Sequence, residues 1–305
     1  MLNQFITPQV FPWINMLSLS FPFLLILHLL LCFMWILFWR KRAVLFLLST
    51  CLLYQPIIGW VNYSSKEEAV TDITVLTMNM KRGNFGKEEC LQHIKNSGAD
   101  VFLVQEYIWD LKDTQYPHFV TGYDVVAIGS KHRIIQQQKI PTGANGEAIF
   151  ADIEIKGQTI RFISVYLNPF MFKKSKVKPT DDYDTNKQKL RYIASTLIPT
   201  FKIHQSEILA IRRAIEESPY PVIVGGDFNA VPNSYEYYQI AEVIEDAFIE
   251  AGNGLGTSFH DYKFPIRIDY IFSSKELEAT TYQVDRSQKL SDHYPVKASF
   301  KFSAP

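Results

Sequence analysis

The side chains of this 305-residue chain that could do chemistry lie in short polar clusters between long apolar runs. Most of these clusters begin where an apolar run ends, and a rigid strand would deliver such side chains to a shared rim. Carboxylates and amides are oxygen ligands for hard cations such as Mg²⁺, and carboxylate and imidazole groups transfer protons. The residues concerned are Asn79, Glu106, Asp227, Asn229, Asp269, Asp292 and His293.

The motif Gly-Gly-Asp227-Phe-Asn229 follows a short apolar run. Glycine lets the backbone turn tightly off a buried strand, and residues two apart in an extended chain point to the same side. Asp227 would orient or deprotonate a water molecule, and the Asn229 amide would stabilise charge on a phosphoryl oxygen. An Asp after two glycines is also a common turn residue, so the motif alone leaves both interpretations open.

The motif Ser-Asp292-His293 places a carboxylate next to an imidazole. Neighbouring side chains diverge in an extended chain, so the imidazole needs a carboxylate from elsewhere. Asp269 precedes an apolar strand segment, where burying it without a partner would be costly, and we predict that it pairs with His293. The alternative is an Asp-His pair in an ordinary loop.

Glu106 directly follows the apolar run 101–104. One or two carboxylates, with water and substrate oxygens, are enough to hold Mg²⁺, so Glu106 is a candidate metal ligand. Taken singly, Glu106 could also be a surface residue at a strand end, and Asn79 could cap a turn.

A scaffold of strands and helices must position these clusters. β-Branched and aromatic residues predict strands at 73–78, 101–104, 123–129, 148–155, 159–167, 222–224, 268–272 and 296–302. An amphipathic pattern closed by Gly98 predicts a helix at 87–96, and a helical region at 186–217 is expected to be interrupted at Pro199. Short strands mixed with helices predict an α/β fold of packed sheets with helices outside.

The first 61 residues have a different composition. Residues 1–39 contain no charged side chain, and after Arg40, Lys41 and Arg42 a second uncharged stretch runs from 43 to 61. A helix needs roughly 20 apolar residues to cross a bilayer, so we predict a hairpin with two spans at about 17–39 and 43–61. The competing interpretation is a signal followed by a buried core helix. A cleaved signal is disfavoured because the basic residues follow the first apolar stretch.

The basic turn predicts the orientation of this hairpin. Arg40, Lys41 and Arg42 are the only basic residues near either span, and positive residues prefer the cytoplasmic side. We therefore expect a multi-pass membrane protein with its catalytic part on the extracytoplasmic side. The expected boundaries are 1–61 for the hairpin, 62–70 for a polar linker and 71–305 for one catalytic domain.

The charge balance and the cysteines of the soluble part bear on its binding partners and on its disulfide bonds. Without the three basic residues of the hairpin it has 28 basic and 31 acidic residues, a net charge of about −3. That balance argues against broad, charge-driven binding of nucleic acid but allows a local basic groove. Cys32 and Cys51 fall in the spans, which leaves Cys90 alone, so no internal disulfide framework is expected.

Taken in order, five motifs resemble the endonuclease/exonuclease/phosphatase superfamily, the fold of pancreatic deoxyribonuclease and abasic-site endonucleases. The resemblance covers about residues 72–302 and rests on Met78-Asn79, Gln105-Glu106, Gly226-Asp227-Phe228-Asn229, Ile268-Asp269-Tyr270 and Ser291-Asp292-His293. It implies a four-layered α/β sandwich, two central β-sheets flanked by helices, with the site at the rim between the sheets.

The resemblance also implies a bound cation. Glu106 would be the principal ligand of Mg²⁺, with Mn²⁺ as an alternative ion, and Asn79 and Asp292 would lie beside it. The sequence departs from many members at Tyr166, where they carry a His. Abasic-site endonucleases are similar to this sequence in having Tyr there, and its hydroxyl can still bond a phosphate oxygen.

The remaining roles follow from the same resemblance. Asp227 would position the nucleophilic water, Asn229 would hold the phosphate, and Asp269 would orient His293. Metal and hydrogen-bond donors would together stabilise an in-line displacement at phosphorus.

The favoured function is hydrolysis of a phosphate ester in nucleic acid, a nucleotide or a phospholipid headgroup. Membrane tethering favours lipid or envelope substrates, whereas Tyr166 and the lysine-rich stretch 173–178 favour nucleic acid. The alternative is a non-catalytic phosphate-binding domain that acts as an anchored receptor, against which stands the complete acidic set. Transport by the hairpin finds no intramembrane charge to support it. Lys131 and Asn145 are weaker candidates for the substrate cleft, and Arg267 is a weaker candidate that would hold a phosphate or pair with an acid.

Overall fold

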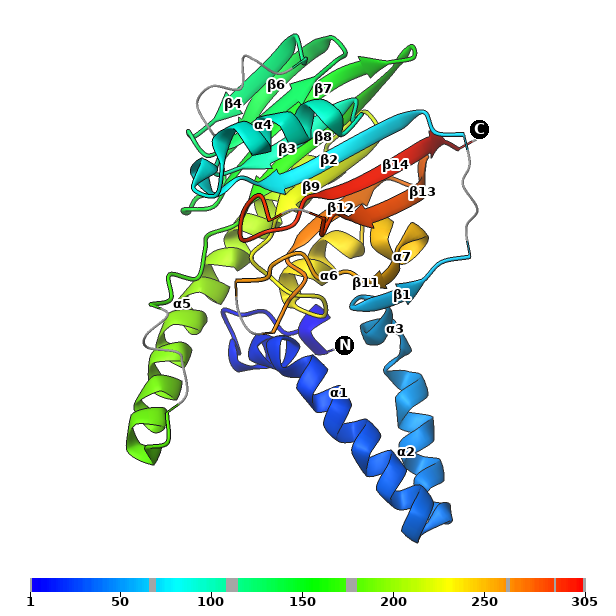
Figure 1. Cartoon of the computed structure of the whole chain (residues 1–305), viewed down its shortest axis with the longest axis vertical. Helices are drawn as coiled ribbons and strands as arrows, with labels where there is room; N and C mark the ends of the chain where they lie inside the picture. The colour runs from blue at the N-terminus through cyan, green and yellow to red at the C-terminus, as the bar shows by residue number, and fades with distance from the viewer. Residues whose placement is uncertain are drawn as a thin grey trace.

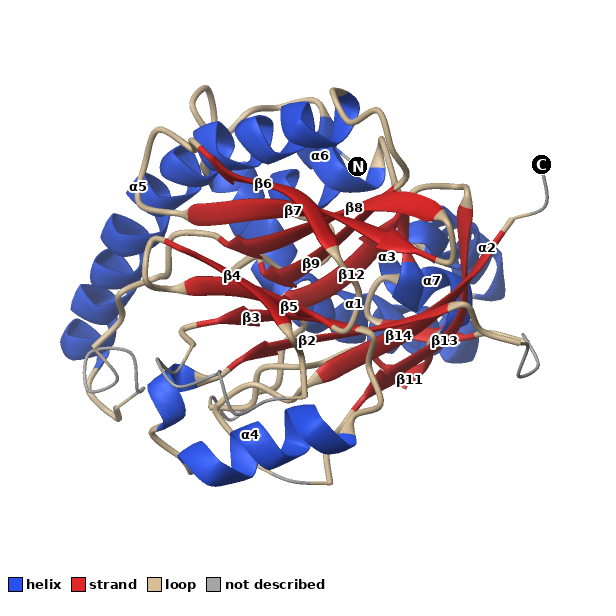
Figure 2. Ribbon diagram, turned by 90° about the horizontal axis from the view of Figure 1, so that it is seen from above, coloured by secondary structure: helices blue, strands red, loops and turns tan. Residues whose placement is uncertain are grey.

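Two six-stranded β-sheets stacked face to face form the centre of the protein, and helices cover their outer faces (Figures 1 and 2). The computed structural model describes residues 2–65, 70–107, 115–173, 180–261, 264–287 and 289–303. Both sheets are mixed, since each contains one parallel pair among antiparallel neighbours. The prediction of an α/β fold with two central sheets flanked by helices is thereby confirmed.

The strands follow the apolar runs of the sequence, because β-branched and aromatic side chains pack well on a buried, pleated surface. The first sheet has the order β13 (Leu277–Val284), β14 (Val296–Phe302), β2 (Ile73–Asn79), β3 (Val101–Gln105), β5 (Val126–Ser130) and β4 (His118–Gly122). The second sheet has the order β10 (Glu245–Asp246), β12 (Asp269–Ser273), β9 (Val222–Asp227), β8 (Gln158–Tyr166), β7 (Glu147–Ile155) and β6 (Ile134–Ile140).

The helices form the two outer layers (Figure 2). α4 (Lys87–Asn96) covers the first sheet, α5 (Tyr183–Glu216) and α6 (Tyr235–Ala241) cover the second, and α7 (Ala247–Ala251) packs on β12 and β13. Separate apolar clusters fill the space between the sheets, between the second sheet and α5 and α6, and between the first sheet and α4. The layers therefore run helix, sheet, sheet, helix.

The helix α5 is continuous through Pro199, so the interruption predicted there does not occur. Proline inside a helix costs about 3 kcal/mol, because it lacks an N–H and clashes with the preceding turn. Leu197 and Phe201, on either side of the proline, are buried, and their packing offsets this cost. The helix begins after Asp182, whose carboxylate accepts a hydrogen bond from the Thr185 N–H at 2.7 Å.

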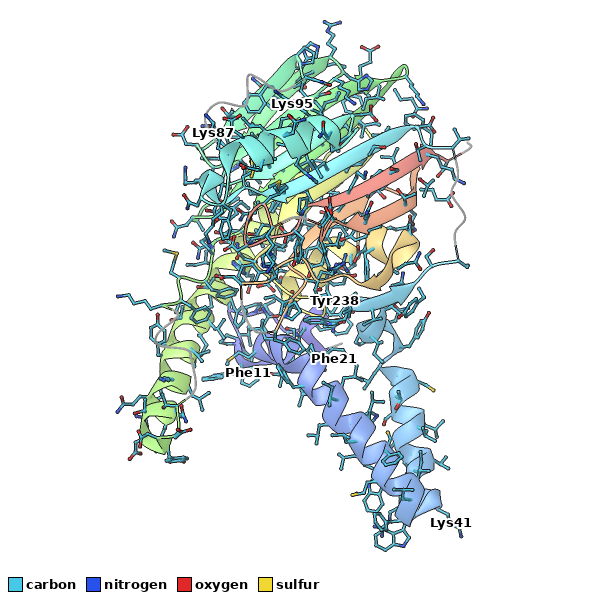
Figure 3. The ribbon with its side chains drawn as sticks, viewed as in Figure 1. Phe11, Phe21, Lys41, Lys87, Lys95 and Tyr238 are labelled. Carbon is cyan, nitrogen blue, oxygen red and sulfur yellow. The ribbon has the colours of Figure 1, made fainter. Side chains whose placement is uncertain are left out.

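The N-terminal segment forms a helical hairpin that projects from the sandwich on the same side as the first half of α5 (Figure 1). After a short 3₁₀ turn at Leu2–Gln4, α1 (Trp13–Phe38) is long and apolar enough to cross a membrane. Among the described residues it is the one helix that meets this criterion. Lys41 lies at the far tip of the hairpin, and Phe21 lies where α1 meets the sandwich (Figure 3).

The second predicted span is divided. It consists of the 13-residue α2 (Arg40–Leu52) and the short α3 (Tyr54–Ile58), and β1 (Val61–Tyr63) follows. Thirteen helical residues reach about 20 Å, short of the roughly 30 Å of a hydrocarbon core. Pro56 has no N–H to continue the ladder of α2, which accounts for the break.

The chain then turns onto the sandwich within the predicted linker. β1 pairs antiparallel with β11 (Asn253–Leu255). The Asn62 side-chain amide donates to the carbonyl oxygens of Phe248 and Ile249 at 2.8 and 2.7 Å. Residues 61–63 are thus attached to the sandwich.

Candidate active site

Four strand ends meet at one rim of the sandwich. Asn79 ends β2, Glu106 follows β3, Tyr166 ends β8 and Asp227 ends β9. β2 and β3 form one parallel pair and β8 and β9 the other, so each pair delivers two side chains to the same edge. A cavity of about 870 Å³ lies there. The described residues predicted for the site that line it are Glu106, Tyr166, Asp227, Asn229, Asp292 and His293.

Asn79 connects the two sheets at this rim. Its buried amide nitrogen lies 3.2 Å from Glu106 Oε1 and 3.1 Å from Asp227 Oδ2. The Tyr166 hydroxyl donates to the same Glu106 oxygen at 3.1 Å. Glu106 has a φ of 44°, a left-handed conformation that is uncommon outside glycine and costs energy. The Glu106 carboxylate is therefore held in one place by hydrogen bonds from both sheets.

His293 lies between two buried carboxylates. Its Nδ1 is 2.8 Å from Asp269 Oδ2, and its Nε2 is 3.8 Å from Asp227 Oδ2. Asp269 and Asp227 are direct neighbours in the antiparallel register of β12 and β9. The imidazole packs edge-on against Phe259, with ring centroids 4.8 Å apart. The structure thus brings together three residues that lie in separate parts of the sequence.

Burial and neighbouring charges shift the pKa values of His293 and Asp227 in opposite directions. Burial disfavours a charged imidazole, but the attraction of Asp269 and Asp227 outweighs it and raises the pKa of His293 to about 9. Burial also raises the pKa of Asp227, because the opposing attraction of His293 is weaker than the cost of desolvating the carboxylate. The net effect on His293 favours the protonated imidazole, whose Nδ1 lies 2.8 Å from Asp269.

Sequence reasoning did not single out Lys81, which enters the site beside Asp292. Its Nζ lies 2.6 Å from Asp292 Oδ2, and its backbone N–H donates to Asn79 Oδ1 at 3.0 Å. Burial disfavours the ammonium charge, but Asp292, Glu106 and Asp261 outweigh this effect and raise the pKa of Lys81. Its one sequence signal is its place two residues after Asn79.

The oxygen donors around Lys81 suit a divalent cation. Carboxylates and an amide are ligands that Mg²⁺ and Mn²⁺ accept, and the ammonium already lies among Glu106, Asp292 and Asp261 as a cation. Burial would raise the pKa of Asp292, but Lys81 and His293 lower it overall, so this carboxylate is ionised. The residues therefore fit a metal ion at Glu106 and Asp292.

A second arrangement could also hold an ion. Ligand atoms of Asp227, Asp269 and His293 lie within 4.8 Å of one another. Asp269 Oδ1 is buried and lacks a hydrogen-bond partner within the described part of the chain. A metal ion at this second position would have to displace the proton that Asp269 and Asp227 favour on the imidazole, so we favour the position at Glu106 and Asp292.

The glycine motif works differently from its predicted role. Gly225 and Gly226 lie inside β9, not in a turn after it. A Cβ on Gly226, which has a φ of 152°, would lie 2.0 Å from the carbonyl oxygen of Val165, so glycine permits the close approach of β8. Asn229 has a φ of 45° and is not extended, and its amide donates to the Leu167 carbonyl at 2.9 Å.

The three weaker candidates do not line the cavity. Lys131 Nζ donates to the Gly98 carbonyl at 3.1 Å, and Asn145 lies exposed in a turn. Arg267 is fully buried and forms an ion pair with Asp246, with Nη2 2.6 Å from Oδ1. Of the lysine-rich stretch, Lys173 lines the cavity, and residues 174–178 lie outside the described residues.

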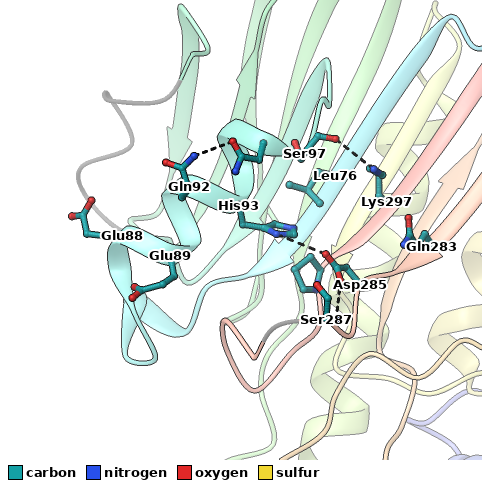
Figure 4. A pocket seen from close by; sticks show the side chains of 12 residues that line it. Leu76, Glu88, Glu89, Gln92, His93, Ser97, Gln283, Asp285, Ser287 and Lys297 are labelled. Atoms are coloured by element: carbon teal, nitrogen blue, oxygen red, sulfur yellow. Dashed lines mark hydrogen bonds and ion pairs between the residues drawn. The ribbon is translucent and has the colours of Figure 1, made fainter.

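A separate cavity of about 630 Å³ lies between α4 and the ends of β13 and β14 (Figure 4). It contains another histidine and carboxylate, His93 and Asp285, with Nδ1 3.9 Å from Oδ2. Burial lowers the pKa of His93. None of the residues predicted for the site lines this cavity, so we assign it no catalytic role.

Comparisons with known proteins agree with this geometry. The sequence profile of the endonuclease/exonuclease/phosphatase family matches residues 76–293. A domain of unknown function, DUF8431, matches residues 1–60. None of the curated proteins matches the sequence.

Several solved structures share the fold. An endonuclease/exonuclease/phosphatase from Bacteroides vulgatus is 18% identical, covers 77% of this chain and 100% of its own, and has a TM-score of 0.58. Mannosyl-6-phosphatase from Bacteroides thetaiotaomicron is 17% identical, covers 75% of this chain and 100% of its own, and has a TM-score of 0.53. A humanized TDP2 from D. rerio is 14% identical, covers 75% of this chain and 98% of its own, and has a TM-score of 0.52.

Proposed function

The chain belongs to the endonuclease/exonuclease/phosphatase family, whose members hydrolyse phosphate esters, and on that premise we propose that it is a membrane-anchored, Mg²⁺-dependent phosphodiesterase. Mn²⁺ is the alternative ion. The observation that carries the proposal is the convergence of Glu106, Asp227, Asp292 and His293 on one cavity. A receptor that only binds phosphate would not need a buried imidazole between two carboxylates.

Each group has a defined part in the proposed reaction. A divalent cation held by Glu106 and Asp292 would neutralise charge on a phosphoryl oxygen. Asp227, at the same rim, orients the attacking water and accepts its proton. His293, kept protonated by Asp269, donates a hydrogen bond to the phosphoryl group and stabilises the charge that develops there.

Two further groups position these residues. Asn79 holds the Glu106 and Asp227 carboxylates through its amide nitrogen, at 3.2 and 3.1 Å. Asn229 uses one of its two amide protons for the Leu167 carbonyl. Its second amide proton can reach a phosphoryl oxygen in the cavity that Asn229 lines.

We further propose that the hairpin anchors the protein in a membrane, with the parts 1–61, 62–70 and 71–305 acting as anchor, connection and catalytic domain. The apolar α1 supports this proposal by its length and composition. The basic tip at Lys41 would face the cytoplasm, and the catalytic domain would lie on the other side.

Hydrolysis of a small soluble diester tests the catalytic proposal. The full chain in detergent should hydrolyse bis-p-nitrophenyl phosphate in Mg²⁺, and EDTA should abolish the reaction. Asp227→Ala should lower kcat by about 10²–10⁴-fold, the range expected for loss of a general base. His293→Ala should lower it by about 10²–10³-fold, the range expected for loss of a donor to the developing charge.

The matched control is His93→Ala, which removes the histidine of the separate cavity (Figure 4). It should leave the rate unchanged. Wild-type rates in both site variants, with folding verified by circular dichroism, would refute the mechanism.

A further inference from the structure

The cavity of the proposed active site has two chemically different walls. The polar wall carries the carboxylates and His293. The rest of the lining is largely apolar, and we call this part the apolar wall; its described residues include Leu19, Phe170, Met171, Phe172, Leu197 and Ile266. A small, fully polar phosphate ester would leave this second wall exposed to water, which is unfavourable for so many apolar side chains.

The hairpin helix α1 itself contributes to the apolar wall. Leu19 belongs to α1 and lines the cavity. Two residues further along, Phe21 is buried in a cluster with Trp60, Val231 and Ile268, against which Leu19 also packs, and Val231 and Ile268 line the cavity as well. The apolar surface therefore continues from the cavity onto the helix proposed to enter the membrane.

The next residues of α1 extend this apolar surface. Phe23 packs against Phe264, with ring centroids 4.8 Å apart, and both rings are more than one-third exposed. Phe264 lies in the same loop region as Ile266 of the cavity wall. A hydrocarbon chain leaving the cavity would thus meet side chains of α1.

The apolar wall also contacts α5. The segment after β8 places Phe170 against Phe201 of α5, with ring centroids 5.5 Å apart. Met171, next in sequence, is 77% exposed. Both α5 and the hairpin project from this side of the sandwich (Figure 1).

The charges of the lining argue against a long polyanion. Among the described lining residues, the cations Lys81, Arg82, Lys173 and protonated His293 face an equal number of carboxylates, those of Glu106, Asp227, Asp261 and Asp292, so the lining has no basic excess. Binding of nucleic acid relies on a basic surface that neutralises many phosphates. One phosphate attached to apolar chains matches the lining better.

We propose that the site acts on a membrane lipid, a phosphate ester whose hydrocarbon chains lie along the apolar wall toward α1. The phosphate would lie at Glu106 and Asp292, and the chains would pass Leu19 and Met171. This inference rests on the proposed function. The substrate would come from the membrane leaflet next to the catalytic domain. The hairpin would hold the cavity beside that leaflet.

The experiment compares four substrates on the full chain reconstituted in vesicles. They are bis-p-nitrophenyl phosphate, a diacyl phospholipid mixture of phosphatidylethanolamine and phosphatidylglycerol, a polyprenyl monophosphate in the same vesicles, and single-stranded DNA. At least one of the two lipids should be hydrolysed with a kcat/KM at least tenfold above that for DNA. Comparison of the two lipid arms distinguishes a diacyl diester from a prenyl monoester.

Met171→Asp tests the apolar wall, because Met171 is exposed and its substitution does not disturb the core. It should lower the ratio of lipid to soluble-ester turnover by about tenfold or more, the size expected for one lost apolar side chain. Ile135→Asp, an equally polar change at an exposed position on β6, should leave both turnovers unchanged.

The outcomes separate the two proposals. Hydrolysis of the soluble ester and DNA without hydrolysis of either lipid would overturn the lipid assignment alone, as would an unchanged ratio in Met171→Asp. If none of the four substrates is hydrolysed in Mg²⁺, both the proposed function and the lipid assignment are overturned.

Discussion

Glu106 depends on its neighbours for its position. Asn79 and Tyr166 both donate hydrogen bonds to Glu106 Oε1, at 3.2 and 3.1 Å, and the backbone of Glu106 is held at a φ of 44°. A carboxylate fixed in this way loses little conformational freedom when it binds a cation. In the proposed mechanism Tyr166 is therefore a positioning residue for Glu106.

Tyr166→Phe should raise the Mg²⁺ concentration that hydrolysis requires. The substitution removes the hydroxyl that orients Glu106 but keeps the buried ring. Loss of such a partner of a metal ligand typically costs about 10–100-fold in metal affinity or activity. The Mg²⁺ concentration for half-maximal hydrolysis of the soluble ester should rise by that factor, as measured by metal titration of the rate.

The control for this variant is Tyr220→Phe, at an exposed tyrosine two residues before β9, at the end of that strand opposite Asp227. Its Mg²⁺ dependence should match that of the wild type. An unchanged Mg²⁺ dependence in Tyr166→Phe, combined with a lower rate, would instead place the hydroxyl on the phosphate.

At the scale of single elements, Arg267 ties three segments together at the start of β12. Its guanidinium bonds both carboxylate oxygens of Asp246 at 2.8 and 2.6 Å, and it donates to the Gly59 carbonyl at 3.0 Å. It also lies over the ring of Phe248 at 4.4 Å. Of the two roles considered for Arg267 from sequence, the structure shows the pairing with an acid, and the side chain joins β10, the start of β12 and the end of the hairpin.

Arg267→Met should destabilise the protein and leave substrate binding unchanged. Removing one partner of a buried ion pair leaves Asp246 buried without its counter-charge, which costs about 3–5 kcal/mol of unfolding free energy. Chemical denaturation would measure this loss. The KM for the soluble ester, measured on the folded fraction, should stay the same.

Lys301→Met removes the cation of an exposed pair with Glu278, in which both side chains are about 40% exposed. Such pairs contribute less than about 1 kcal/mol, so this variant should unfold almost as the wild type does. A large rise of KM in Arg267→Met would assign Arg267 to the substrate after all.

The elements with a strong local pattern were predictable from sequence. α4 and β2 occupy the ranges expected from amphipathic spacing and from an apolar run. β6 was missed because it is an edge strand whose middle residues, Gln136–Lys139, are exposed and carry no apolar signal. The end of the second span could not be foreseen either, since β1 pairs with a strand almost 200 residues away.

The residues of the candidate site also differ in whether a local sequence pattern reveals them. Its acidic residues stand at strand ends, and a strand end is a local feature that sequence reveals. Lys81 has no such signal, because its contact with Asp292 spans 211 residues and exists only in the folded chain. The apolar wall was hidden for the same reason, as Leu19 and Phe172 come from distant segments.

At the scale of the whole molecule, buried polar contacts connect the hairpin to the catalytic domain. The Asn15 amide of α1 donates to both carboxylate oxygens of Glu236, at 3.1 and 2.8 Å. Glu236 is paired with His204 of α5 at 3.0 Å, and His204 Nε2 lies 2.7 Å from the Asn168 carbonyl, next to the site. The hairpin is therefore packed into the domain and not merely tethered to it.

This buried pair should give stability a pH dependence. Burial disfavours charge on both groups, but their mutual attraction and hydrogen bonds outweigh it, raising the pKa of His204 above 6.5 and lowering that of Glu236 below 4.5. The contribution of His204 is thus complete below pH 6.5 and is lost as the pH rises through its raised pKa. That of Glu236 is complete above pH 4.5 and is lost as the pH falls through its lowered pKa.

His204→Gln measures this contribution. It should lower the unfolding free energy by about 3–5 kcal/mol near pH 6, where both partners are charged. The difference in Tm between the wild type and the variant should shrink as the pH is raised above neutrality. A difference that is constant across this range would mean that His204 acts only as a neutral, space-filling side chain.

The proposed orientation of the hairpin in the membrane can be tested by cysteine labelling. Lys41 lies at its tip (Figure 3), and Ser303, directly after β14 of the catalytic domain, is exposed. In a background without Cys32, Cys51 and Cys90, Lys41→Cys should react with a membrane-impermeant maleimide only after cells are permeabilised. Ser303→Cys should react in intact cells, because positive residues stay in the cytoplasm and the catalytic domain is placed outside. The reverse pattern would put the domain in the cytoplasm, and reaction of both positions in intact cells would mean that the 13-residue α2 and its partner α1 lie on the bilayer and do not cross it.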